Sequence, residues 1–334
     1  MSQTHARVSA RPPADETSTA KFADDVRYYL RQRPPQLPSR YLYDALGSAL
    51  FEAICQLPWY GLTRAETALL TTYADDIFST LSPLSRIIEL GAGSGEKLGT
   101  LLTAAHRHRL PGRLHLVDVS RQALETAARA LSTFEDVFVI THQAPYEVGL
   151  GEISRERFTG GRSLVLFLGS NIGNFDPPCA DAMLQQIRAT LAPGDAVLIG
   201  ADLVKPEGDL LLAYDDPLGV TRAFNLNLLA RINRELGGDF DLGGFRHRAL
   251  WNGEASRIEM HLVSVRTQRI RVPAAQIDLM MNEGDAIWTE SSYKYRPDEV
   301  VQMLERSGFR RLRQWVEPSG QFALTLVEAI SSGP

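Results

Sequence analysis

The feature that most constrains this chain is a short apolar run that ends in glycines at alternate positions. Residues 86–97 read Arg-Ile-Ile-Glu-Leu-Gly-Ala-Gly-Ser-Gly-Glu-Lys, a pattern typical of a buried strand that turns tightly into a helix. Glycine lets a backbone approach a ligand closely, and open α/β sheets bind ligands outside the carboxyl ends of their strands. The segment therefore predicts a nucleotide-type cofactor loop at one edge of a parallel sheet.

The acid ahead of the glycines indicates which cofactor the loop binds. A dinucleotide loop reads G-x-G-x-x-G and seats a pyrophosphate, whereas here Glu89 precedes Gly91, Gly93 and Gly95. A carboxylate at this position repels a diphosphate and attracts the sulfonium and ammonium groups of S-adenosylmethionine. We therefore favour a methyltransferase, and a dehydrogenase is the weaker alternative.

A second acid follows at the end of the next apolar run. Residues 114–118 read Leu-His-Leu-Val-Asp, which predicts a strand whose final residue, Asp118, accepts hydrogen bonds from ribose hydroxyls. Capping of a turn or helix is the competing interpretation for this side chain.

Composition narrows the class of protein. The chain has 334 residues, 44% of them hydrophobic, and a net charge of −5 without a Lys/Arg-rich run, so we expect a globular protein with no nucleic-acid partner. Cys55 and Cys179 cannot form a disulfide framework, and no Cys/His cluster has metal-ligand spacing, so we expect no metal. No apolar run approaches the roughly 20 residues that span a bilayer, and no signal segment opens the chain. We expect a cytoplasmic protein with no membrane contact.

Before the glycine loop, the pattern predicts a tail and then helices. Residues 1–21 lack an apolar period and are expected to be disordered. Apolar residues recur at helical spacing over 22–33 and 37–57. Thr63 and Glu66 are spaced as a capping box that begins a helix ending near residue 81.

From the loop onward, strands alternate with helices. Strands are predicted at 86–90, 114–119, 137–141, 163–168 and 196–203, and helices from 96, from 120 and over 180–191. This alternation indicates an α/β fold, a doubly wound and mostly parallel sheet, over residues 65–204.

Past residue 204 the pattern changes. A long helix is predicted at 219–236, a hairpin from strands at 257–265 and 269–272, and a closing strand at 322–327. We assign 22–64 and 205–331 to a second, α+β domain that binds substrate, and we expect the N-terminal helices to pack with this C-terminal lobe.

A further chemical signal follows the fourth predicted strand. Residues 169–174 read Gly-Ser-Asn-Ile-Gly-Asn, and an asparagine at that edge can hold a substrate amine or carboxylate because an amide both donates and accepts. An asparagine that caps a turn before two prolines is an equally good interpretation.

Beyond these features, the chain resembles the histidine Nα-methyltransferases of ergothioneine biosynthesis. The segments that carry the resemblance are 41–48, 57–66, the loop at Gly91, 169–174, 213–216, 257–260 and 289–297. The resemblance implies a Rossmann-like class I methyltransferase domain beside a second domain built from both ends of the chain. It also implies S-adenosylmethionine as cofactor and L-histidine as a small-molecule substrate, which three transfers convert to the betaine hercynine; we expect a monomer.

The resemblance also implies roles for individual residues. The implied cofactor contacts are Gly91, Gly93, Lys97, Asp118, Tyr146 and Gly169, to which charge adds Glu89. The implied substrate contacts are Tyr60, Asn174 and Tyr214 for the carboxylate and amine, Glu290 and Ser292 for the imidazole, Met260 as a wall, and Tyr43 and Phe51 near the reacting nitrogen. Tyr43 and Asn174 are the candidate catalytic residues. Taken singly, Tyr43, Phe51, Tyr60 and Met260 read as core, Tyr214 as part of a loop lid, and Glu290 and Ser292 as solvent-facing strand residues.

Two departures from the family pattern bear on the site. Where the family reads Pro-Glu-Tyr-Tyr-Pro-Thr, residues 58–63 read Pro-Trp-Tyr-Gly-Leu-Thr, so one aromatic is lost. Where it has an Asp-Phe pair at the adenine, this chain has Pro145-Tyr146, and losing the acidic partner is worth about 1–3 kcal/mol. Methylation of another amino acid or an indole-containing amine, and a non-catalytic S-adenosylmethionine-binding module, are therefore alternatives.

Overall fold

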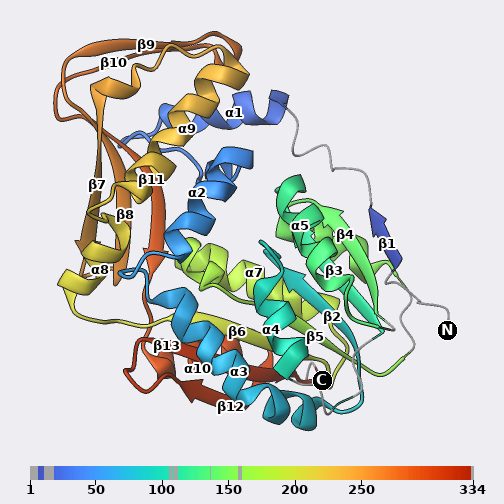
Figure 1. The fold of residues 1–334 in the computed structure, drawn as a ribbon. Helices are drawn as coiled ribbons and strands as arrows, with labels where there is room; N and C mark the ends of the chain where they lie inside the picture. The colour runs from blue at the N-terminus through green and yellow to red at the C-terminus, as the bar shows by residue number, and fades with distance from the viewer. Residues whose placement is uncertain are drawn as a thin grey trace. The chain divides into compact units, whose positions relative to one another are not determined.

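The chain folds into two compact units (Figure 1). The computed structural model describes residues 7–10, 19–104, 108, 112–135, 137–156 and 160–331. Unit 1 contains Met1–Ala14, Leu62–Val204 and Lys294–Pro334, and unit 2 contains Asp15–Gly61 and Lys205–Tyr293. Each unit is therefore assembled from segments far apart in sequence.

Unit 1 is built on an eight-stranded sheet in the order β1-β4-β3-β2-β5-β6-β13-β12. The strands are β1 (Arg7–Ala10), β2 (Leu84–Leu90), β3 (Arg113–Asp118), β4 (Phe138–Gln143), β5 (Arg162–Phe167), β6 (Ala196–Asp202), β12 (Phe309–Val316) and β13 (Phe322–Ala329). Neighbours from β1 to β6 are parallel, whereas β13 is antiparallel to both β6 and β12. The strand order reverses between β2 and β5, which is where doubly wound sheets bind ligands.

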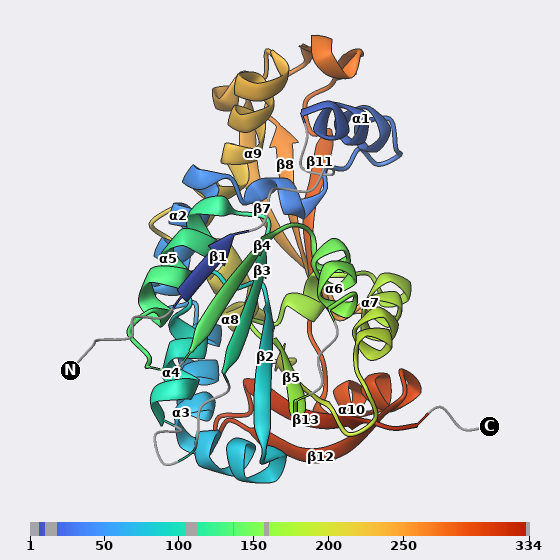
Figure 2. The same cartoon turned by 90° about the vertical axis from the view of Figure 1, so that its right-hand side faces the viewer.

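Helices cover both faces of this sheet. The helices are α3 (Leu62–Leu81), α4 (Glu96–Ala104), α5 (Arg121–Leu131), α6 (Tyr146–Ser154), α7 (Pro177–Thr190) and α10 (Pro297–Arg306). Figure 2 shows α3, α4 and α5 on one face and α6, α7 and α10 on the other. Two covered faces explain why β6 is buried along its whole length, since strands of such sheets read as continuous apolar runs.

Unit 2 combines helices with two small antiparallel sheets. Its elements are α1 (Thr19–Leu30), η2 (Ser39–Leu42), α2 (Ala45–Cys55), α8 (Glu207–Tyr214), α9 (Val220–Leu236), η4 (Leu242–Gly244), β7 (Phe245–Asn252), β8 (Arg257–Ser264), β9 (Gln268–Val272), η5 (Pro273–Ala275), β10 (Ile277–Met281) and β11 (Ala286–Tyr293). One sheet has the order β11-β8-β7 and the other pairs β10 with β9. Helix α9 contacts α2, η2, β7 and β8, and so forms the centre of the unit.

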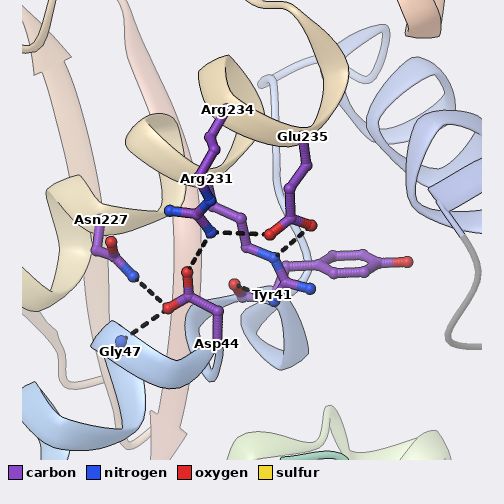
Figure 3. Close-up of polar contacts among 7 residues, drawn as sticks. All are labelled: Tyr41, Asp44, Gly47, Asn227, Arg231, Arg234 and Glu235. Carbon is purple, nitrogen blue, oxygen red and sulfur yellow. Dashed lines mark hydrogen bonds and ion pairs between the residues drawn. The ribbon is translucent and has the colours of Figure 1, made fainter.

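A carboxylate joins the N-terminal segment to α9 (Figure 3). Asp44 caps α2 by accepting from Gly47 N at 2.7 Å, and the same oxygen accepts from Asn227 Nδ2 at 2.7 Å. Its second oxygen accepts from Arg234 Nη2 at 2.6 Å. These contacts and the packing of α2 on α9 confirm that the N-terminal helices pack with the lobe that follows residue 204.

The predicted parallel sheet is confirmed, but two predictions about the chain after residue 204 are wrong: the domain that contains segment 294–331 and the pairing of the predicted hairpin. Segment 294–331 was assigned to the substrate domain, yet β13 pairs with β6 in the sheet of unit 1. A buried ion pair fastens this return, with Lys294 Nζ 2.8 Å from Asp202 Oδ2. The apolar run of β13, buried on both faces, is the signal that should have placed it in the layered sheet.

The predicted hairpin of strands 257–265 and 269–272 is also wrong. Strand β8 pairs with β7 and β11, whereas β9 leaves that sheet and pairs with β10. Periodicity locates strands but does not choose their partners. Of the strands that supply those partners, β7 and β10 were not predicted, and β11 was expected only as a strand-like run around Glu290 and Ser292.

The N-terminal tail was predicted to be disordered through residue 21. Within that span, Arg7–Ala10 forms β1, parallel to β4, and α1 begins at Thr19. Residues 1–6 and 11–18 lie outside the described residues. Throughout the described ranges, every helix is too short or too polar to cross a bilayer.

Candidate functional site

The glycine loop of unit 1 has the conformation that its sequence requires. Gly91, Gly93 and Gly95 have φ angles of 81°, 50° and 78°, which side chains on L-residues disfavour. A Cβ at Gly91 would lie 2.5 Å from Asn171 Nδ2 and 2.9 Å from the Tyr146 hydroxyl. The loop thus brings polar groups from β2, α6 and the turn after β5 to one point at the switch in strand order.

Glu89, the penultimate residue of β2, is the most unusual group in this region. Its side chain is only 2% exposed, and its Oε2 has no hydrogen-bond partner among the residues that the structure describes. Burial raises the pKa of Glu89 to about 8; Lys97 opposes the rise, and the carboxylates of Glu66 and Asp118 add to it. A buried acceptor without a donor is costly, so this atom fits a cationic or N–H-bearing ligand.

Glu66 does not form the predicted capping box. Its carboxylate accepts from Gly169 N with both oxygens, at 2.8 and 3.0 Å, and lies 2.6 Å from Lys97 Nζ. The side chain is fully buried, and it joins α3 to the first turn of α4 and to the turn after β5. The sequence indicated an acid near a helix start, but not that the acid points away from its own helix.

Asp118 and Tyr146 complete the cofactor side. Asp118 accepts from Gly93 N at 3.2 Å and from Ser120 N at 2.8 Å, and burial raises its pKa although these donors oppose the rise. The capping interpretation is therefore confirmed in part, since the carboxylate supports the loop and the turn before α5. The contact with ribose hydroxyls stays a prediction, for which the carboxylate has remaining acceptor capacity. Burial likewise raises the pKa of the Tyr146 phenol, which stays neutral.

The two asparagines after β5 occupy different places. Both belong to the turn η3 (Asn171–Asn174), which follows Ser170 in the left-handed conformation at φ 55°. Asn171 Nδ2 donates to the Leu90 carbonyl at 3.5 Å, so Asn171 meets the glycine loop. Asn174, the predicted substrate residue, is half-buried at the end of the turn.

In unit 2, the predicted aromatic residues form one connected cluster. Tyr43 contacts Phe51 with ring centroids 5.5 Å apart, Phe51 contacts Tyr60 at 6.4 Å, and Tyr60 contacts Tyr214 at 6.1 Å. Phe224 of α9 lies 5.5 Å from Tyr43 and 6.0 Å from Phe51. The sequence analysis missed Phe224, because a phenylalanine inside an amphipathic helix reads as core.

The aromatic cluster meets polar residues of β11 at Tyr214, the last residue of α8. Tyr214 Oη and Ser292 Oγ are 2.8 Å apart, and Glu290, 8% exposed, pairs in register with Met260. Glu290 and Ser292 share a face because alternate strand residues point the same way. A β-bulge between Trp288 and Glu290 determines which face of β11 these two side chains occupy. These residues are buried and do not face solvent.

The groups of unit 1 fit S-adenosylmethionine. Glu89 offers an unpaired carboxylate oxygen to a cation, and Gly91 and Gly169 leave the backbone bare where a Cβ would meet the polar side chains of Asn171, Tyr146 and Lys97. No group of three or more His, Cys, Asp or Glu side chains within the described ranges could hold a metal ion. The assignment of each residue to a ligand stays a prediction.

Comparisons with known proteins agree with this chemistry. The family model described as histidine-specific methyltransferase, SAM-dependent, matches residues 22–329. Histidine N-alpha-methyltransferase of Mycolicibacterium smegmatis is 40% identical over 94% of this chain and 96% of its own length, and the Mycobacterium tuberculosis protein of that name is 39% identical over 90% and 93%. Ergothioneine biosynthesis protein 1 of Neurospora crassa is 28% identical over 84% of this chain, which covers 32% of that protein.

Proposed function

This chain belongs to the histidine-specific, S-adenosylmethionine-dependent methyltransferases, and on that premise we propose that it methylates the α-nitrogen of L-histidine. Three successive transfers give the betaine hercynine. The observation that carries the proposal is the face of β11, where the buried Glu290 and Ser292 lie beside Met260, with Ser292 hydrogen-bonded to Tyr214.

Glu290 and Ser292 supply what an imidazole needs and an apolar ring does not. A carboxylate accepts an imidazole N–H in a charge-assisted hydrogen bond, and a hydroxyl either donates to or accepts from the second ring nitrogen. Met260, directly opposite Glu290 in register, packs on the ring. An indole or phenyl ring offers fewer hydrogen-bonding groups to this buried polar set than an imidazole does.

The cofactor residues act by charge and by backbone shape. Glu89 binds the cationic part of S-adenosylmethionine, and Asp118 accepts hydrogen bonds from its ribose. At Gly91 the loop lets the cofactor lie close to the backbone. When bound, the cofactor supplies a methyl group on a sulfonium sulfur. Placement of the two reactants in near-attack geometry provides most of the rate enhancement.

The reacting amine must lose its proton before it can attack. An α-amino group has a pKa near 8, and a neighbouring sulfonium charge lowers it. Tyr43 is the proposed proton acceptor through a water: the water takes the amine proton and passes it to solvent, and the phenol orients that water. The faces of Tyr43 and Phe51 hold the methylated cation as it grows. Tyr60, Tyr214 and Asn174 are proposed to bind the carboxylate and amine.

The proposal is tested by mass spectrometry of the purified protein incubated with S-adenosylmethionine and each common amino acid separately. We expect a product from histidine alone, heavier by three methyl groups. Glu290→Gln should abolish most histidine turnover, whereas the exposed Glu283→Gln should not change it. Methylation of a different amino acid would overturn the imidazole assignment, and no product from any amino acid would favour a binding module.

A further inference from the structure

A buried histidine of unit 2 contacts the backbone of a predicted substrate residue. His247 lies on β7 and is 5% exposed. Its Nε2 lies 2.9 Å from the carbonyl oxygen of Tyr214, and its Nδ1 lies 2.9 Å from Nδ2 of Asn225 on α9. None of the roles proposed above uses this contact, which we call the Tyr214 clamp and which consists of His247, Asn225 and the Tyr214 carbonyl.

The partners of His247 specify one protonation state. A carbonyl oxygen only accepts, so Nε2 must carry a proton. The Asn225 amide nitrogen also donates to the carbonyl of His261 at 3.3 Å, and this second bond fixes which end of the amide faces the imidazole. Because that end is a donor, Nδ1 must accept, and His247 is therefore neutral with its proton on Nε2.

The clamp acts on the part of the unit that is proposed to bind histidine. The Tyr214 hydroxyl, at the other end of that residue, lies 2.8 Å from Ser292 Oγ. On β7, Ala249 pairs with Met260, which pairs with Glu290, and His247 is two residues from Ala249. His247 therefore shares the sheet face that carries Glu290 and lies in the adjacent row of paired residues.

Resting on the proposed function, we propose that His247 and Asn225 are positioning residues that hold Tyr214 for histidine binding only while His247 is neutral. Protonation of Nδ1 would set an N–H against the N–H of Asn225 across 2.9 Å. Either the amide then turns and loses the His261 carbonyl, or the imidazole moves away from Tyr214. In both cases the Tyr214 hydroxyl, which lies beside Ser292, is no longer held in position.

The charged groups that act on His247 come from the segment after α8 and from the first turn of α9. Burial lowers the pKa of His247; its bond to Tyr214 and the carboxylates of Asp215 and Asp216 oppose this, and Arg222 adds to it. Asp215 Oδ1 lies 3.9 Å from Nε2 but is half exposed, so solvent screens it. The strand β8 contributes the His261 carbonyl, while the His261 ring belongs to the opposite face of the sheet.

The test is the pH dependence of KM for histidine in three variants. In His247→Gln, the side-chain amide keeps a donor for the Tyr214 carbonyl but does not titrate. In Asn225→Asp, a carboxylate accepts from Nδ1 and favours the imidazolium, which still donates from Nε2. His261→Gln removes a histidine of the same sheet that does not contact Tyr214, and so serves as the matched control.

In wild type, we expect KM for histidine to rise as pH falls below about 6.5, because burial lowers the pKa of His247, and by about pH 5 the rise should be roughly fivefold larger than in His247→Gln. The substrate imidazole titrates in the same range, but that contribution is common to both proteins. In Asn225→Asp, the KM for histidine should stay low at acid pH and rise towards pH 8.5. In His261→Gln, it should follow the wild-type profile. The KM for S-adenosylmethionine should not change in any variant.

Equal pH profiles of wild type and His247→Gln would overturn the inference, as would an equally large difference between these two proteins in the pH profile of KM for S-adenosylmethionine. If either variant fails to fold, 15N NMR of wild type decides instead. A neutral His247 protonated on Nε2 at pH 7 supports the clamp, and an imidazolium or the Nδ1–H form overturns it. Absence of histidine methylation by wild type at every pH would instead refute the proposed function, and the NMR result would still test the clamp.

Discussion

The two units build their candidate sites in different ways. In unit 1, the groups that fit the cofactor lie at strand ends and glycine turns, so backbone conformation creates the space and a few acids give it charge. In unit 2, the proposed histidine site is made of side chains, an aromatic cluster completed by polar residues of β11. A backbone-built site depends on φ angles and tolerates little, whereas a side-chain site can be retuned residue by residue.

The largest effect should come from a single methyl group in the backbone-built site. Gly91→Ala places a Cβ at φ 81° and against Asn171 and Tyr146, at a combined cost of about 3 kcal/mol, or roughly a hundredfold in affinity for S-adenosylmethionine. Calorimetric titration with the cofactor measures this. Gly99→Ala, in α4 with open space around it, is the control and should bind normally. Equal affinity of Gly91→Ala and wild type would show that the loop is not the cofactor site.

A smaller effect should follow from a substitution of Glu66, the buried carboxylate that contacts Gly169 and Lys97 in unit 1. Glu66→Gln removes the charge that pairs with Lys97 at 2.6 Å; since Lys97 is 26% exposed, the loss is about 1–2 kcal/mol, near tenfold in cofactor affinity. The KM for histidine should stay within twofold. The exposed neighbour Glu96→Gln should behave as wild type, and a change confined to histidine would contradict this assignment.

In unit 2, Asp44→Ala tests whether the aromatic cluster depends on the α2 cap. Loss of the cap and of the bonds to Asn227 and Arg234 (Figure 3) should lower the free energy of unfolding by about 1–2 kcal/mol. Because Tyr43 directly precedes Asp44, we expect the KM for histidine to rise severalfold without a change in cofactor affinity. Thermal unfolding and steady-state kinetics measure both, with the exposed Asp24→Ala as control. A stability loss with an unchanged KM would separate the cap from the cluster.

The smallest effect is the pH dependence of cofactor binding through Glu89. Its pKa is raised to about 8 by burial, so in the free protein its contribution to stability is full below its unfolded pKa and is lost as pH rises through about 8. A cationic cofactor favours the ionised form, so affinity for S-adenosylmethionine should rise a few fold between about pH 6.5 and 8.5 relative to S-adenosylhomocysteine, which lacks the sulfonium charge. Glu89→Gln should remove that difference, and if the difference persists in the variant, the charge argument fails.

The comparison between units also shows which features could be predicted from the sequence and which could not. The strands of the parallel sheet and the long helix α9 follow from apolar periodicity, and the glycine loop follows from local composition, because each is encoded over a few consecutive residues. The partners of β8, β9 and β13 do not follow, since strand pairing depends on long-range packing. Glu66 was assigned to a helix cap for the same reason, because only the fold brings Gly169 and Lys97 to it.

By itself, the sequence determined the kind of chemistry. An acid before a glycine turn, a second acid after the next strand and segments shared with a family of methyltransferases all lie in consecutive residues, where charge and backbone freedom are visible. The tertiary structure decided what supports that chemistry: the unpaired oxygen of Glu89, the Glu66 bridge, Phe224 in the aromatic cluster and the clamp on Tyr214. Burial and hydrogen-bond partners are properties of residues brought together from distant segments, so they exist only once the chain has folded.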